Sequence, residues 1–82
     1  MGMNYIYQAP TGNIHVDIDL STDDNYYLSG QVWNEGEEKI EFGYEGITGS
    51  DVTEPSISPP TLLPIMKRAI LEAAQKFLEA LD

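Results

Sequence analysis

Cysteine is absent from this sequence, and basic residues are scarce, because lysine and arginine together number only 4 among 82 residues. Without cysteine, neither disulfides nor thiolate-bound metals hold the fold, so apolar packing must stabilise it. The shortage of basic residues disfavours direct binding to DNA, RNA or anionic membranes, since such binding uses lysine and arginine to neutralise phosphates.

Long apolar runs are also missing from the chain. No stretch approaches the roughly 20 apolar residues that a membrane-spanning helix needs. The first ten residues, MGMNYIYQAP, lack the basic segment and following apolar segment of a signal peptide. We therefore expect a cytoplasmic protein that does not contact membranes.

The charge that is present is acidic and unevenly distributed. Aspartate and glutamate number 14, which gives a formal net charge of −10. Residues 1–60 hold most of these acids and a single base, Lys39. Apolar residues make up 41% of the chain, as in a folded protein. The length predicts one domain, residues 1–82.

Alternation of apolar and polar residues predicts four antiparallel strands, near 3–8, 13–20, 26–33 and 39–46. The clearest alternation is NIHVDIDL at 13–20. Its two predicted faces are an apolar one, with Ile14, Val16, Ile18 and Leu20, and a polar one, with Asn13, His15, Asp17 and Asp19. The short turns between the strands favour a meander in which consecutive strands pair.

A helix is predicted at 62–81, after a loop over 47–60 that is rich in turn residues. Thr61 is a suitable N-cap, and Pro64 favours a helix start near 62–64. The residues that follow are mostly good helix formers. The predicted fold is therefore α+β, with a four-stranded antiparallel meander and one C-terminal helix packed across one face.

The apolar side of this predicted helix covers an arc of about 200°, which is wider than one sheet requires. Either the 47–60 loop or a second copy of the protein must cover the extra width. The second alternative makes the protein an assembly subunit that forms homodimers through this helix, and the candidate dimer face consists of Ile65, Ala69, Leu78 and Leu81.

The aspartate-rich stretch HVDIDLSTDDNYY at 15–27 does not fit a standard metal loop. Counted from Asp17, the EF-hand pattern requires glycine and glutamate where Thr22 and Leu28 stand. A looser calcium site at 17, 19, 23 and 24 is an alternative, as is acid-base chemistry by His15 beside Asp17. No nucleophile motif accompanies this pair, so we expect no enzyme, no metal and no cofactor.

The remaining interpretation is a binding surface. The expected polar face and the neighbouring hairpin tip carry six candidate acidic contacts, namely Asp17, Asp19, Glu41, Glu45, Glu37 and Glu38. Tyr27 and Trp33 are expected on the same face, and such aromatic residues are frequent interface anchors. A dense acidic surface attracts basic partners.

In size and charge alone, the chain resembles the small acidic proteins with which phages and mobile elements block host defence enzymes. Some of those proteins occupy nucleic-acid-binding surfaces by placing carboxylates where phosphates would lie. This resemblance implies an inhibitor or regulator that docks on a basic protein, with no direct nucleic-acid binding. It assigns no role to any particular residue.

Overall fold

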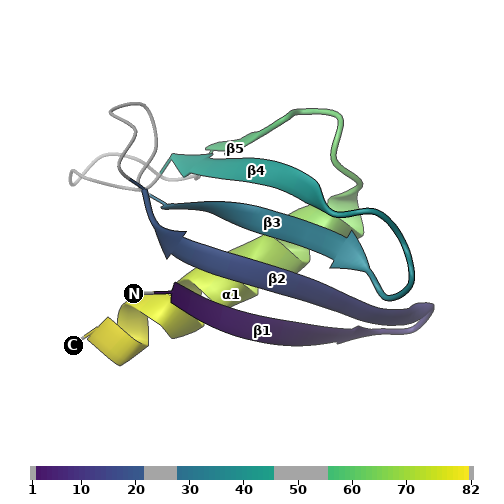
Figure 1. Cartoon of the computed structure of the whole chain (residues 1–82), viewed down its shortest axis with the longest axis horizontal. Coiled ribbons are helices and arrows are strands. Elements are labelled where there is room, and N and C mark those ends of the chain that lie inside the picture. The colour runs from purple at the N-terminus through teal and green to yellow at the C-terminus, as the bar shows by residue number, and fades with distance from the viewer. Residues whose placement is uncertain (1, 22–27, 46–55, 82) are drawn as a thin grey trace.

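A computed structural model describes residues 2–21, 28–45 and 56–81 of the chain. Within these residues, five strands form one antiparallel sheet in the order β1-β2-β3-β4-β5, and one C-terminal helix, α1, packs against one face of it (Figure 1). The bounds are Gly2–Ala9 for β1, Gly12–Leu20 for β2, Leu28–Asn34 for β3, Ile40–Glu45 for β4, Ser56–Ser58 for β5 and Pro64–Leu81 for α1. The predicted α+β class, antiparallel sheet and C-terminal helix are confirmed.

Among the described residues the sheet has a fifth strand beside the predicted four, because Ser56–Ser58 lies within the segment that was expected to be a loop. This short strand pairs with β4, and Ile57 lies opposite Tyr44. Three residues between prolines carry too weak a pattern to predict a strand. Pairing with β4 decides the conformation of this segment. Residues 47–55 of the expected loop lie outside the described residues.

The hairpin turns hold the strands in register. Ala9 pairs with Gly12, so only Pro10 and Thr11 connect β1 to β2. Between β3 and β4, the amide of Glu37 donates to the carbonyl of Asn34 at 2.9 Å. Gly36 has a φ of 86° in this turn, a left-handed conformation that glycine adopts without steric cost.

The inner face of the sheet is closed by α1. Alternate residues of β2 are sealed, since Ile14, Val16 and Ile18 are at most 1% exposed. Each fully buried side chain of this size contributes about 1.5–3 kcal/mol. The buried helix residues recur at three- and four-residue spacing and include Met66, Ala69, Ile70, Ala73, Ala74 and Phe77.

Leu20 departs from the predicted pattern. Alternation placed it on the sealed face, but its side chain is 45% exposed. It is the last residue of β2, and α1 crosses the sheet obliquely, ending beneath the β1 side (Figure 1). The helix packs mainly on β1 and β2 and less on β3. The alternation therefore predicted correctly which side chains of β2 are buried from 14 to 18. It did not predict where the helix stops covering the sheet.

The helix begins at Pro64, at the late end of the predicted start. Proline suits the first helical position because its missing N–H would have no partner within the helix there. Leu63, and not Thr61, consequently precedes the first helical residue. Just before it, the amide of Leu62 donates to the carbonyl of Pro59 at 3.2 Å, and the Leu62 side chain is buried in the core.

Candidate functional site

The outer face of the sheet, opposite the helix, carries the residues predicted to bind a partner. The strand register aligns them in rows. Asn4 lies opposite Asp17, Asp17 opposite Gln31, and Gln31 opposite Glu41, which makes one polar row across four strands. Since neighbouring strands are about 4.8 Å apart, the two carboxylates of this row lie roughly 10 Å from each other.

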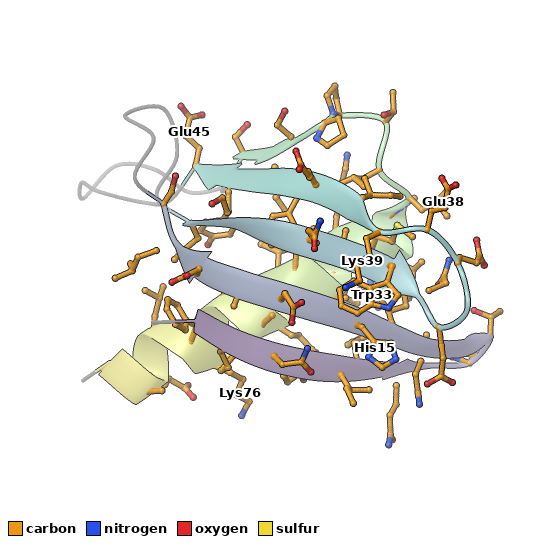
Figure 2. All side chains as sticks on the ribbon, in the orientation of Figure 1. His15, Trp33, Glu38, Lys39, Glu45 and Lys76 are labelled. Atoms are coloured by element: carbon orange, nitrogen blue, oxygen red, sulfur yellow. The ribbon has the colours of Figure 1, made fainter. Side chains whose placement is uncertain are left out.

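A second row lies one step further along the strands. It contains Asp19, Ser29 and Gly43, and it ends at Ser58 on β5. Glu45 is the next outward residue of β4 and stands at the end of the sheet (Figure 2). Asp19, Glu41 and Glu45 are exposed, whereas Asp17 is half-buried. The structure therefore places four of the predicted acidic residues on one face.

Three of these carboxylates have no basic partner among the described residues. Within residues 2–21, 28–45 and 56–81, Asp17, Glu41 and Glu45 form no ion pair with lysine or arginine. Asp17 instead accepts a hydrogen bond from the side-chain amide of Asn4. The carboxylate of Asp19 accepts one from the Leu20 backbone amide at 2.8 Å. The neutral hydrogen bond from Asn4 leaves the negative charge of Asp17 in place.

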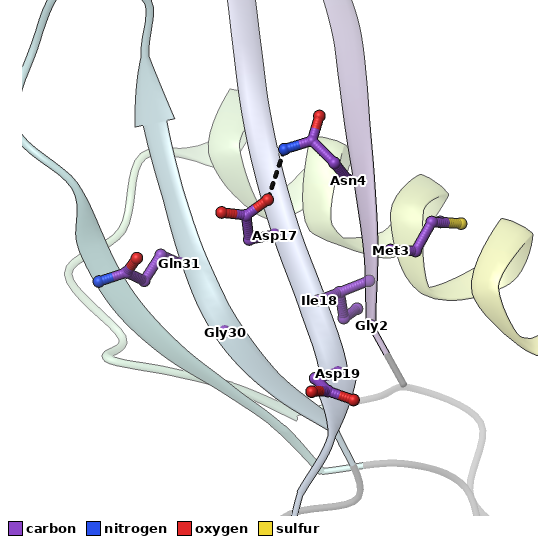
Figure 3. A pocket seen from close by; sticks show the side chains of 8 residues that line it. All are labelled: Gly2, Met3, Asn4, Asp17, Ile18, Asp19, Gly30 and Gln31. Carbon is purple, nitrogen blue, oxygen red and sulfur yellow. Dashed lines mark hydrogen bonds between the residues drawn. The ribbon is translucent and has the colours of Figure 1, made fainter.

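Shallow hollows flank β3 on this acidic area. One, of about 320 Å³, is lined by residues that include Asn4, Asp17 and Gln31 (Figure 3). Another, of about 350 Å³, lies on the β4 side of Gln31 and includes Glu41 in its wall. The outer face is thus uneven where its carboxylates and amides gather.

Gly30 sits in β3 beside both hollows and permits an unusually close approach of strands. A Cβ atom built at this position would lie 1.8 Å from the carbonyl oxygen of Asp17. No side chain fits at such a distance from neighbouring backbone. Glycine at 30 thereby allows the backbone of β2, and with it Asp17, to lie as close to β3 as it does.

An aromatic cluster adjoins the acidic area. Trp33 stacks on His15, with ring centroids 5.3 Å apart and an interplanar angle of 7°. The Nζ atom of Lys39 lies 4.6 Å from the centroid of the Trp33 ring, a cation–π distance. Figure 2 shows Trp33 between these two side chains on the outer face. Ile6, which pairs with His15, extends the cluster onto β1 and is 48% exposed.

His15 does not contact Asp17 in the way that the acid-base alternative required. Its Nε2 atom lies 3.2 Å from Oε1 of Glu35, a residue of the β3–β4 turn. The turn is held near β2 because the amide of Glu35 donates to the carbonyl of Asn13 at 3.1 Å. Glu37 and Glu38 are exposed in the same turn.

Several members of this face were not singled out from the sequence. Asn4, Ile6 and Gln31 have no charge or motif, so only the register places them beside Asp17 and His15. The contact of Lys39 with Trp33 could have been predicted, because the two residues stand on opposite sides of the short turn between the third and fourth predicted strands. Tyr27, which was predicted to bind, lies outside the described residues.

The predicted dimer residues of the helix have different environments. Ala69 is fully buried in the core, and Ile65 is partly buried against it. Leu78 is half-buried. The side chain of Leu81 is not among those described. Elsewhere on the helix Leu71 is 39% exposed, and Leu63, just before it, is 54% exposed.

Two tyrosines of the inner face have raised pKa values. Burial raises the pKa of Tyr44 above its usual value. The pKa of Tyr5 is also raised, first by burial and then by its hydrogen bond and proximity to the Glu72 carboxylate. The Tyr5 hydroxyl donates to Oε2 of Glu72 at 3.1 Å, which links β1 to α1.

Among the described residues, no group of three or more histidine, aspartate or glutamate side chains is arranged to hold a metal ion. Positions 23 and 24 of the alternative calcium site are outside that part of the chain. In the part of the chain that is described, α1 is too polar to cross a membrane.

Comparisons of the chain with protein-family models, with curated proteins and with solved structures found no match. The acidic face and its aromatic cluster must therefore be interpreted from their own chemistry.

Proposed function

We propose that this protein is a non-enzymatic binding module that docks its outer sheet face on a basic surface of another protein. The observation that carries this proposal is the set of outer-face carboxylates, Asp17, Asp19, Glu41 and Glu45, beside an aromatic cluster. Like charges on one surface repel each other, so neutral side chains at these positions would stabilise the fold at least as well. A partner rich in lysine and arginine would remove this repulsion.

Trp33 supplies the apolar part of the same surface. Interfaces usually combine a small number of desolvated aromatic or aliphatic anchors with a polar rim. Here the ring of Trp33 is already held by His15 and Lys39, so little side-chain freedom is lost on binding. Long-range attraction by the carboxylates would increase the association rate, and the cluster would slow dissociation.

The partner class that fits this chemistry best is a protein that itself binds nucleic acid. Such proteins bear clustered lysine and arginine residues that are placed to neutralise phosphates. A surface of clustered carboxylates would compete for those residues, which makes the protein an inhibitor or regulator of its partner. The resemblance in size and charge to acidic anti-defence proteins of phages supports the same role.

Affinity purification with matched baits tests the proposal. The wild-type protein should capture a partner that is lost when Asp17, Asp19, Glu41 and Glu45 are all changed to lysine. Affinity for the purified partner should fall at least about tenfold between roughly 0.05 and 0.3 M salt, because exposed charges are screened. Nucleic acid added in excess should displace the protein from that partner.

A single-residue pair provides the control. Glu41→Lys changes the outer face, whereas Glu79→Lys makes the same change in net charge on an exposed position of α1. Only Glu41→Lys should weaken binding. Equal loss with both variants, or binding that ignores both salt and the quadruple change, would contradict the proposal.

A further inference from the structure

The two edges of the sheet are protected very differently. β5 is three residues long and is followed by Pro59 and Pro60. Short strands and prolines are common ways of preventing an edge from pairing with another chain. β1, at the opposite edge, is eight residues long and pairs with β2 without interruption from Gly2 to Ala9. No described strand pairs with its other side.

The composition of β1 gives its free edge no protection either. The strand GMNYIYQA contains no charged residue and no proline in a chain whose net charge is −10. Tyrosine and isoleucine favour extended backbone. An uncharged segment of this kind with unpaired backbone amides and carbonyls is a template for a further strand.

We propose that a second copy of this chain occupies this edge, with the two β1 strands antiparallel about a two-fold axis at Ile6. In this register Ile6 faces Ile6 of the second copy, Asn4 faces Gln8, and Tyr5 faces Tyr7. Directly opposed residues of an antiparallel pair point to the same face. The pairing would cover the exposed Ile6 side chains and would bring no two like charges together across the junction.

The helix places two charged side chains on this side of the molecule. Glu72 lies against β1 through its contact with Tyr5, and Lys76 follows one helical turn later on the same side. Figure 2 shows Lys76 extending past the free edge of β1.

This arrangement differs from a dimer that forms through the apolar helix face, because it leaves Leu71 and Leu78 uninvolved. It would also join the two outer faces on one side of a continuous sheet. Because both copies are strongly acidic, screening by salt should strengthen the dimer, whereas it should weaken binding to a basic partner. Dimerisation and partner binding can therefore be tested independently.

Sedimentation of the whole chain between about 1 and 300 µM tests the dimer, since one strand pair with limited side-chain burial should dissociate on the order of micromolar. Ile6→Lys and Ile6→Glu should each raise the dissociation constant at least about tenfold, because like charges would meet at the axis. An equal mixture of the two variants should recover the dimer. That recovery would also show that both variants are folded.

The absence of cysteine from the chain permits a clean cross-linking experiment. Ile6→Cys should form a disulfide between copies, because opposed Cα atoms at about 4.5–5.5 Å suit the bond. Leu71→Cys, on the exposed helix surface, is the matched control and should cross-link much more slowly. Leu71→Lys should leave the dissociation constant unchanged.

Three outcomes would overturn the inference. They are a monomer at every concentration and salt condition, a dimer that survives Ile6→Lys but not Leu71→Lys, and a mixture of Ile6→Lys and Ile6→Glu that stays monomeric. The second outcome would assign dimerisation to the helix face instead.

Discussion

Asp17 and Ile18 are neighbours on β2, and they occupy environments with almost nothing in common. Ile18 is 1% exposed beneath α1, whereas Asp17 faces outward, hydrogen-bonded to Asn4 and without a basic partner among the described residues. The same contrast holds between the two faces of the whole sheet. One face consists of apolar side chains that are sealed by the helix, and the other of carboxylates, amides and one aromatic cluster.

This difference separates the residues that stabilise the fold from those that are free to serve a partner. Removing apolar surface from water on the inner face provides most of the folding free energy. Glu41 and Glu45, which are exposed and form no ion pair with a described lysine or arginine, provide none of it, and like charges on one face repel each other. The composition of the outer face is therefore not explained by stability, and for this reason we propose that it binds a partner.

The largest expected effect is on the inner face. Ile18→Ala should lower the free energy of unfolding by about 2–5 kcal/mol, through lost burial and an unfilled cavity. In a domain of this size that is a large fraction of the total stability. Urea unfolding followed by circular dichroism measures the change. A loss below about 1 kcal/mol would show that the inner face is loosely packed and would break the contrast between faces.

The next effect tests the close approach of β2 and β3. Gly30→Ala should cost about 1–3 kcal/mol, because the new methyl group would meet the carbonyl of Asp17. Ser29→Ala, one residue away on the outer face, is the control and should change stability by less than about 0.5 kcal/mol. Chemical denaturation of both variants makes the comparison. Equal stability of the two would show that the strands separate without cost at Gly30.

A pH titration tests the inner face in another way. The pKa values of Tyr44 and Tyr5 are raised in the folded protein, so the folded state binds these protons more tightly than the unfolded state does. Their contribution to stability is complete below the unfolded pKa of about 10, and it is lost as pH rises through the folded values.

The urea midpoint should therefore fall as the pH rises above about 10, where unfolded tyrosines ionise. Tyr44→Phe should make this fall less steep, because the substituted ring has no proton to lose. An identical alkaline fall in Tyr44→Phe and in the wild type would show that Tyr44 ionises as readily when folded as when unfolded.

The smallest effect should come from the outer face. The double change Glu41→Gln and Glu45→Gln should leave stability within about 0.5 kcal/mol of the wild type, with any gain largest at low salt. Such a gain would come from removing the repulsion between the two negative charges. Thermal unfolding at two salt concentrations measures it. A marked loss of stability would mean that these carboxylates support the fold, which would weaken the case for a binding role.

Much of the architecture follows from local pattern. The alternation in β2 predicted which side chains are buried from 14 to 18, and the apolar spacing after Pro64 predicted the helix. These patterns are visible in the sequence because one face of each strand or helix packs on a neighbouring layer, so apolar residues recur with the period of that element. The outward positions of Asp17, Asp19, Glu41 and Glu45 follow from the same alternation.

The remaining features depend on contacts between residues far apart in the chain. Ser56–Ser58 becomes a strand because β4 offers it backbone partners, and Leu20 stays exposed because the helix crosses obliquely. His15 contacts Glu35 and Trp33, and not Asp17, because the register of β2 with β3 brings those residues to it. The pattern of residues within a single strand or helix does not predict these contacts.

The helix, the strand alternation and the acidic character of the chain follow from the amino-acid sequence alone, because each depends on residues close together along it. Tertiary packing sets which strands form the edges, where the helix stops covering the sheet and which side chains meet on the outer face. These depend on register and crossing angle, which are fixed when distant segments pack against one another.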